Sequence, residues 1–106
     1  MFDTNDEGFA NYTTSGNLAV GNVVLNVTAA NGGGGTFTNA TAYTLNNTAG
    51  ITINISAGAT LAGLVNQGTI QGTNSNAIYL NSTGTITSLS NSGTITESVG
   101  GVAGAL

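Results

Sequence analysis

The residues that could do chemistry are few. The sequence has four carboxylates (Asp3, Asp6, Glu7 and Glu97) and no Lys, Arg, His or Cys. Such a chain has no customary base to activate a nucleophile, no thiolate and no amine for a Schiff base. A carbohydrate-cleaving enzyme would need carboxylates clustered on one face, and Glu97 stands alone in the second half of the chain. We therefore expect a protein that is not an enzyme.

The same composition limits cofactors and partners. Zinc and other soft metals lack the Cys and His that usually bind them. Asp3, Asn5 and Glu7, followed by Gly8, resemble the opening of a calcium-binding loop, but the closing position holds Thr14 instead of a bidentate Glu. Calcium is thus a weak candidate ligand, and the alternative is that this acidic terminus is simply solvated.

Charge and hydropathy narrow the partners further. A formal net charge of −4 without any cation argues against charge-based binding to nucleic acid or anionic lipid. No apolar run approaches the roughly 20 residues that a membrane-spanning helix needs, so we expect no membrane insertion. With 40% hydrophobic residues, 4% charged residues and no proline, the composition favours a folded β-rich domain over a disordered chain.

The elements that position these residues are indicated by a repeat. Leu64-Val-Asn-Gln-Gly-Thr-Ile70 returns 25 positions later as Leu89-Ser-Asn-Ser-Gly-Thr-Ile95. A period of this size is typical of a solenoid, in which one supersecondary unit stacks on the next. Weaker echoes link Leu45 to Leu64 at a spacing of 19 and Leu25 to Leu45 at 20. We therefore expect about four irregular coils of 19 to 25 residues.

Short runs with strand-like alternation divide the best coil into three: residues 69–71, 77–80 and 85–87. Further runs of this kind are found at 23–27, 36–38, 43–45, 51–55 and 60–61. Three short strands per coil predict an all-β fold, a parallel β-helix in which each strand pairs with its counterpart one coil away. An antiparallel sandwich is the alternative, and the 25-residue identity favours the solenoid.

The alternation also predicts which side chains point inward. The expected core comprises Ile51, Ile53, Ile55, Ile70, Ile78, Leu80, Ile86 and Ile95, whereas Tyr79 is expected to face outward. Asn66 and Asn91 occupy matching places in the repeat, and we expect their amides to stack in a ladder, although Asn is also simply common in turns.

The two ends of the chain differ from its middle. Residues 1–17 are acidic and aromatic, and we interpret them as an N-terminal cap or docking arm; residues 18–106 are expected to form the solenoid, with an incomplete last coil lacking a polar outer face. Apolar and aromatic residues at both ends are then candidates for self-association: Phe2, Phe9, Tyr12, Val102 and Leu106.

The phrases Ile53-Asn-Ile-Ser-Ala-Gly-Ala-Thr-Leu61, Leu64–Ile70 and Leu89–Ile95 resemble repeats of bacterial autotransporter passenger domains and related adhesins. The resemblance covers about residues 45–100. It implies a right-handed parallel β-helix, export to the cell surface or extracellular space, and a stalk, fibrous or adhesive role, and it carries over no catalytic residue.

Two functional hypotheses follow. In the first, the protein is an extracellular structural subunit whose partner is itself, with copies stacking head to tail into a fibre or stalk. In the second, it is part of an adhesin passenger whose exposed Thr/Asn face binds a host surface glycan or protein.

Overall fold

The computed structural model describes residues 2–3, 11–29, 34–73 and 75–97, and within these ranges every regular element is a β-strand. The strands are β1 (Phe2–Asp3), β2 (Asn11–Thr13), β3 (Leu18–Val20), β4 (Leu25–Val27), β5 (Gly34–Asn39), β6 (Thr44–Asn47), β7 (Ile53–Ile55), β8 (Thr60–Asn66), β9 (Thr69–Gly72), β10 (Ile78–Leu80), β11 (Thr85–Asn91) and β12 (Thr94–Glu97).

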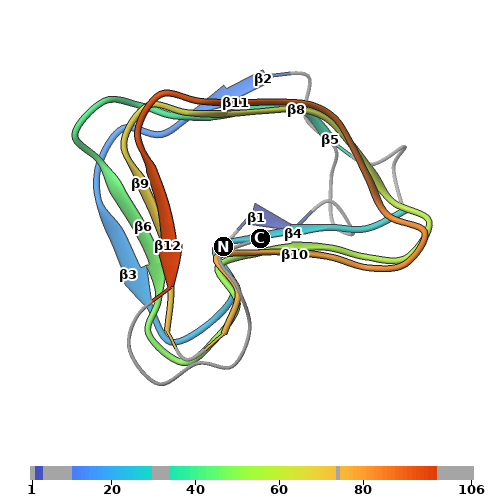
Figure 1. Cartoon of the computed structure of the whole chain (residues 1–106), viewed down its shortest axis with the longest axis horizontal. Helices are drawn as coiled ribbons and strands as arrows, with labels where there is room; N and C mark the ends of the chain where they lie inside the picture. Colours follow the sequence, from blue (N-terminus) through green and yellow to red (C-terminus); the bar gives the residue numbers. More distant parts are fainter. Residues whose placement is uncertain (1, 4–10, 30–33, 74, 98–106) are drawn as a thin grey trace.

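These strands form three parallel sheets, each with four strands, in the orders β1-β4-β7-β10, β11-β8-β5-β2 and β12-β9-β6-β3. Every third strand therefore lies beside its counterpart, and three consecutive strands make one coil of a solenoid. In Figure 1 the chain passes counter-clockwise around three sides while later coils lie nearer the viewer, so the solenoid is right-handed. The predicted fold class is confirmed, with strands falling into four coils.

The register corrects the expected coil lengths. Ile53 pairs with Ile78, and Thr69 pairs with Thr94, at the predicted spacing of 25. The spacings of 19 and 20 are wrong, however, because Leu45 pairs with Ile70 and Leu25 pairs with Ile53. Paired residues across the structure lie 23 to 28 positions apart (Phe2 with Leu25, Leu25 with Ile53). The two shorter spacings are misleading because Leu25, Leu45 and Leu64 lie in three different sheets.

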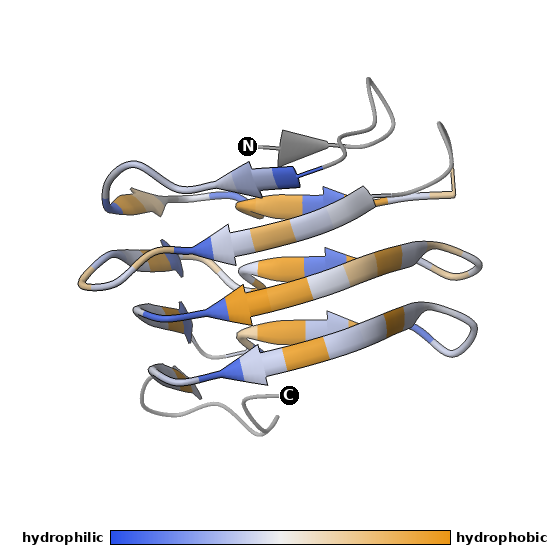
Figure 2. Cartoon of the chain, turned by 90° about the horizontal axis from the view of Figure 1, so that it is seen from above, coloured by the Kyte–Doolittle hydropathy of each residue, from blue (hydrophilic) through white to orange (hydrophobic). Residues whose placement is uncertain are grey.

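The core fills the space between the three sheets. Its fully buried hydrophobic residues recur at matching positions of successive coils, which Figure 2 shows as hydrophobic bands repeated from strand to strand: Val24, Leu25, Val27, Phe37, Leu45, Ile53, Ile55, Ala59, Leu61, Leu64, Ile70, Ala77 and Ile78. Burying one such side chain contributes about 1.5–3 kcal/mol. Stacking like residues over like thus stabilises the coil-to-coil register.

Four of the eight residues predicted for the core, Ile53, Ile55, Ile70 and Ile78, are fully buried. Ile86 and Ile95 pack against the core but stay partly exposed. Two expectations need correction. Ile51 lies before β7 in the turn and is half-buried, and Leu80 is 48% exposed although its register partner Ile55 is buried.

The solenoid sheets extend into the segment interpreted as a cap or arm. β1 pairs with β4 and β2 pairs with β5, both in parallel register, so these two strands belong to the first coil. Whether residues 1–17 also act as a cap stays a prediction.

Candidate self-association surface

No cluster of catalytic or metal-binding type is found among the described residues. No three His, Cys, Asp or Glu side chains there could hold a metal ion together. The carboxylate of Glu97, at the end of β12, has its Oε2 atom buried without a hydrogen-bond partner among the described residues. The weak calcium candidate cannot be placed, because Asn5, Glu7 and the side chain of Asp3 lie outside the described residues.

A ladder of asparagine amides runs along one corner of the solenoid. Asn39, Asn66 and Asn91 end β5, β8 and β11 and are register partners in successive coils. Nδ2 of Asn39 donates to Oδ1 of Asn66 at 3.0 Å, and Nδ2 of Asn66 donates to Oδ1 of Asn91 at 2.9 Å. Asn39 and Asn66 are fully buried, so these bonds satisfy polar groups that water cannot reach.

The first coil ends this ladder with a hydroxyl. Thr14, which directly follows β2, takes the place that asparagine holds in later coils. Its Oγ1 donates to Oδ1 of Asn39 at 2.9 Å and accepts from the backbone N–H of Ala40 at 3.0 Å. Thr14 is itself buried. The ladder therefore comprises Thr14, Asn39, Asn66 and Asn91.

The ladder has a fixed direction. Nδ2 of Asn66 also lies 3.1 Å from the carbonyl of Gly68 and 2.9 Å from that of Thr94. Because a carbonyl only accepts hydrogen bonds, the amide NH₂ must face these groups and Oδ1 must face the preceding coil. Nδ2 of Asn39 faces the carbonyls of Tyr43 and Thr69 in the same way. Every donor thus points toward the later coil.

The glycine of the repeated phrase is explained by the same corner. A Cβ on Gly68 would lie 2.1 Å from the carbonyl oxygen of Tyr43, and one on Gly93 would lie 2.0 Å from the carbonyl oxygen of Gly68. Backbones of adjacent coils approach too closely here for any side chain. Each part of the phrase Asn-x-Gly-Thr-Ile therefore has a structural role. The asparagine supplies an amide to the ladder, the glycine allows the backbones of adjacent coils to approach closely, and the isoleucine packs in or against the core.

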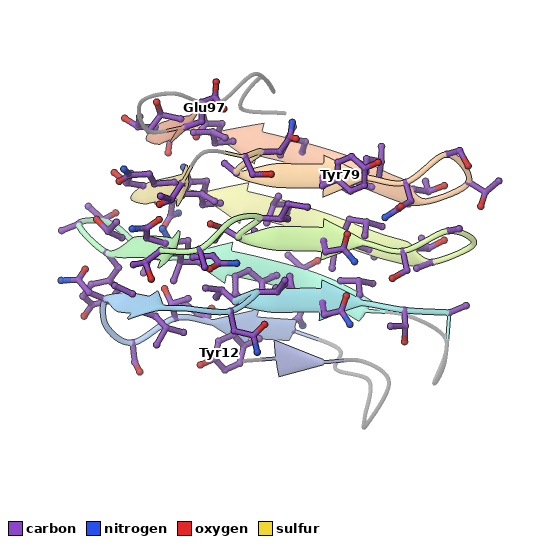
Figure 3. All side chains as sticks on the ribbon, turned by 90° about the horizontal axis from the view of Figure 1, so that it is seen from below. Tyr12, Tyr79 and Glu97 are labelled. Carbon is purple, nitrogen blue, oxygen red and sulfur yellow. The ribbon has the colours of Figure 1, made fainter. Side chains whose placement is uncertain are left out.

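The last coil exposes residues that occupy core positions. Leu89 is the register partner of Leu64, and Leu80 is the register partner of Ile55. Leu64 and Ile55 are fully buried, whereas Leu89 is 44% exposed and Leu80 is 48% exposed. The third large exposed hydrophobic residue, Tyr79, lies on the outer face as expected (Figure 3). We call Leu80, Ile86, Leu89, Asn91 and Ile95 the C-terminal face.

The first coil presents a matching set at the other end. Tyr12 stacks on Phe37 with ring centroids 5.5 Å apart, and Leu18 packs against the core while staying partly exposed. A cavity of about 200 Å³ is lined by Tyr12, Leu18, Val24, Phe37 and Leu45, together with residues 14–17. We call Tyr12, Thr14, Leu18 and this cavity the N-terminal face; Tyr12 and Glu97 lie toward opposite ends of the stack in Figure 3.

Most of the predicted self-association residues lie outside the part of the chain that the structure describes. Of these, only the side chain of Tyr12 is placed, on the N-terminal face. Phe9, Val102 and Leu106 and the side chain of Phe2 lie outside the described residues. Sequence reasoning missed Thr14 and Asn39 as members of the ladder, and it missed Leu18 and Leu89 as parts of the two faces. Counting 25 on from Leu64 reaches Leu89, so the repeat carried the signal for that residue. Asn39 lies 27 positions before Asn66, so the repeat did not identify it or Thr14.

A second polar ladder lies on another sheet. Nδ2 of Asn54 donates to Oδ1 of Asn26 at 2.8 Å, and Nδ2 of Asn81 donates to Oδ1 of Asn54 at 3.2 Å. All three residues are only half-buried. Here the donors point toward the earlier coil, which is the reverse of the buried ladder.

Comparison with protein-family models, curated proteins and solved structures found no match for this chain. In the described part of the chain, no helix is long and apolar enough to cross a membrane.

Proposed function

We propose that this protein is a non-enzymatic structural subunit that stacks end to end through its solenoid axis into a fibre or stalk. The observation that carries the proposal is the exposure of Leu80 and Leu89 at positions that are fully buried one coil earlier. A further parallel coil laid on the C-terminal face would bury both side chains.

The energetics favour such stacking. Complete burial of a leucine is worth about 1.5–3 kcal/mol relative to full exposure, and these two are about half exposed. Each backbone hydrogen bond formed by β10, β11 and β12 with a further coil adds about 0.5–1.5 kcal/mol net. The ordering and association costs are moderated because the strands are already in place.

The cell surface is the proposed location. The support is the resemblance of residues 45–100 to autotransporter and adhesin repeats, together with the parallel β-solenoid that those repeats imply. A stalk or fibre needs length and rigidity, and a solenoid supplies both by adding coils about 4.8 Å apart along one axis.

Light scattering after size exclusion, with negative-stain microscopy, tests the proposal. We expect oligomers that grow with concentration and fibres in which each copy adds about 19 Å, the height of four coils. Replacing both Leu80 and Leu89 by serine should yield a monomer. Tyr79→Ser is the matched control, since it removes an exposed side chain of the outer face and should leave assembly intact. A wild-type chain that stays monomeric at high micromolar concentration would contradict the proposal.

A second candidate function is adhesion to a host glycan or protein. It is favoured by the exposed hydroxyl side chains of β11, including Thr85, Thr87 and Ser90. A glycan array distinguishes the two functions, because a pure scaffold should bind no glycan.

A further inference from the structure

The two ends of the buried ladder are chemically complementary. At the C-terminal face, Asn91 uses Oδ1 to accept from Asn66, and no hydrogen bond is donated by its Nδ2 among the described residues. At the N-terminal face, Oγ1 of Thr14 donates once and accepts once. A hydroxyl oxygen has two acceptor positions, so Thr14 can accept one more hydrogen bond.

We propose, building on the end-to-end stacking above, that the ladder continues across the junction between two copies. Nδ2 of Asn91 in one copy donates to Oγ1 of Thr14 in the next, with β11 of the first paired in parallel with β2 of the second. The partner at the C-terminal face is thus the N-terminal face of a second copy.

The direction of the ladder makes the junction head to tail. If two C-terminal faces met, the NH₂ groups of two Asn91 side chains would oppose each other with no acceptor between them, which leaves buried donors unsatisfied. The chain has no Lys, Arg or His, so ion pairs between side chains are not available to orient the copies. Orientation then rests on hydrogen-bond polarity and on shape.

The register independently brings apolar side chains together. Tyr12, Phe37, Leu64 and Leu89 are successive partners in one sheet, so continuing that sheet places Leu89 against Tyr12 of the next copy. In a neighbouring sheet the same extension places Ile95 against Leu18. All four of these side chains are partly or largely exposed in the single chain.

The cavity at the N-terminal face of one copy provides space in which Leu89 of the other copy can pack. Its volume of about 200 Å³ and its lining by Tyr12, Leu18, Phe37 and Leu45 suit an apolar group. An apolar cavity of about 150 Å³ is known to hold a benzene molecule, so this one accommodates a leucine. The proposed contact is heterologous and continues the solenoid along its own axis. Such a contact does not close into a ring, so it generates an open filament.

Disulfide trapping tests the register. Ser90, Val65, Thr38 and Thr13 are successive partners, so the proposed junction places Ser90 of one copy beside Thr13 of the next. Neighbouring parallel strands are about 4.8 Å apart, which is within the Cα range of a disulfide. The chain contains no cysteine that could compete.

On mixing Ser90→Cys with Thr13→Cys under mild oxidation, we expect a disulfide-linked heterodimer as the main product. Ser88→Cys mixed with Thr13→Cys is the matched control, because Ser88 pairs two residues away, opposite Asn11, and should cross-link at least tenfold less. Equal cross-linking of both pairs, or a dominant Ser90→Cys homodimer, would overturn the proposed junction.

A second measurement isolates the hydrogen bond. Asn91→Asp keeps an oxygen to accept from Asn66 but removes the donor, and we expect self-association to weaken at least tenfold. Ser90→Asp adds the same charge one residue away on the outward face and should weaken association by much less. Equal effects of the two variants would overturn the role of Asn91. If wild-type chains associate but these tests fail, only the junction is wrong; if wild-type chains never associate, the proposed function fails too.

Discussion

Asn66 donates to Asn91 across 2.9 Å, and the two residues hold the same place in coils 25 positions apart, yet only Asn66 is buried. The same contrast separates Leu64 from Leu89. Identical residues in identical registers thus differ in environment solely because one coil is covered by the next. Comparing the two members of each pair by mutation therefore measures how much coil stacking contributes to stability.

The ladder should stabilise the fold from within. Asn66→Ala removes the acceptor for Asn39 and the donor to Asn91 and to the Thr94 carbonyl, all in the buried corner. We expect a loss of about 2–4 kcal/mol in the free energy of unfolding, because an unsatisfied buried polar group costs about 1–3 kcal/mol. Urea denaturation of dilute protein measures it. Asn91→Ala is the control and should cost below about 1.5 kcal/mol; equal losses would mean that the ladder does not contribute through burial.

Truncating the leucine pair should separate folding from assembly. Leu64→Ala leaves a cavity in the core, and we expect it to cost about 2–5 kcal/mol. Leu89→Ala should cost below about 1.5 kcal/mol in the monomer, since its side chain is 44% exposed, while weakening self-association. Unfolding at low concentration and sedimentation at high concentration report the two effects. A Leu89→Ala variant that assembles like wild type would argue against the C-terminal face as the contact.

The close approach of adjacent coils at the ladder corner predicts that position 93 must be glycine. Gly93→Ala would drive a methyl group to 2.0 Å from the carbonyl oxygen of Gly68, so the two coils would have to separate locally. We expect a loss of about 2–3 kcal/mol or more, in the range of overpacked cores. Gly16→Ala is the matched control, because its Cβ would meet nothing within 4 Å. Thermal unfolding followed by circular dichroism should show a lower Tm for the first variant and a nearly unchanged Tm for the second.

Salt should promote assembly. Each copy carries a formal charge of −4 and no cation, so copies repel one another at any orientation. Because the Debye length falls from about 30 Å at 0.01 M to about 8 Å at 0.15 M ionic strength, added salt screens this repulsion. We expect the apparent dissociation constant to decrease as NaCl rises over this range. Weaker association at higher salt would indicate that attraction between charges holds the copies together, which the proposed junction does not contain.

The sequence predicted the fold well where the repeat is exact. Thr69 and Thr94, and Asn66 and Asn91, pair as their spacing of 25 indicates. The sequence-based prediction failed where the coil length changes. Five positions separate Asn39 from Thr44, whereas three separate Asn66 from Thr69. That longer corner carries Tyr43 where later coils have glycine, so no local phrase identified Asn39 as a ladder residue. Thr14 was hidden for a further reason, since a hydroxyl replaces the amide there.

By itself the sequence determined which reactive side chains this chain lacks and how its last two coils are aligned, because residue types and an exact repeat need no coordinates. It could not distinguish Leu64 from Leu89, or Ile55 from Leu80, since alternation specifies which way a side chain points but not what lies beyond it. Burial depends on the neighbouring coil, and only the tertiary structure shows which coils have neighbours on both sides. The direction of the amide ladder was likewise decided in three dimensions, by the backbone carbonyls that each NH₂ group must face.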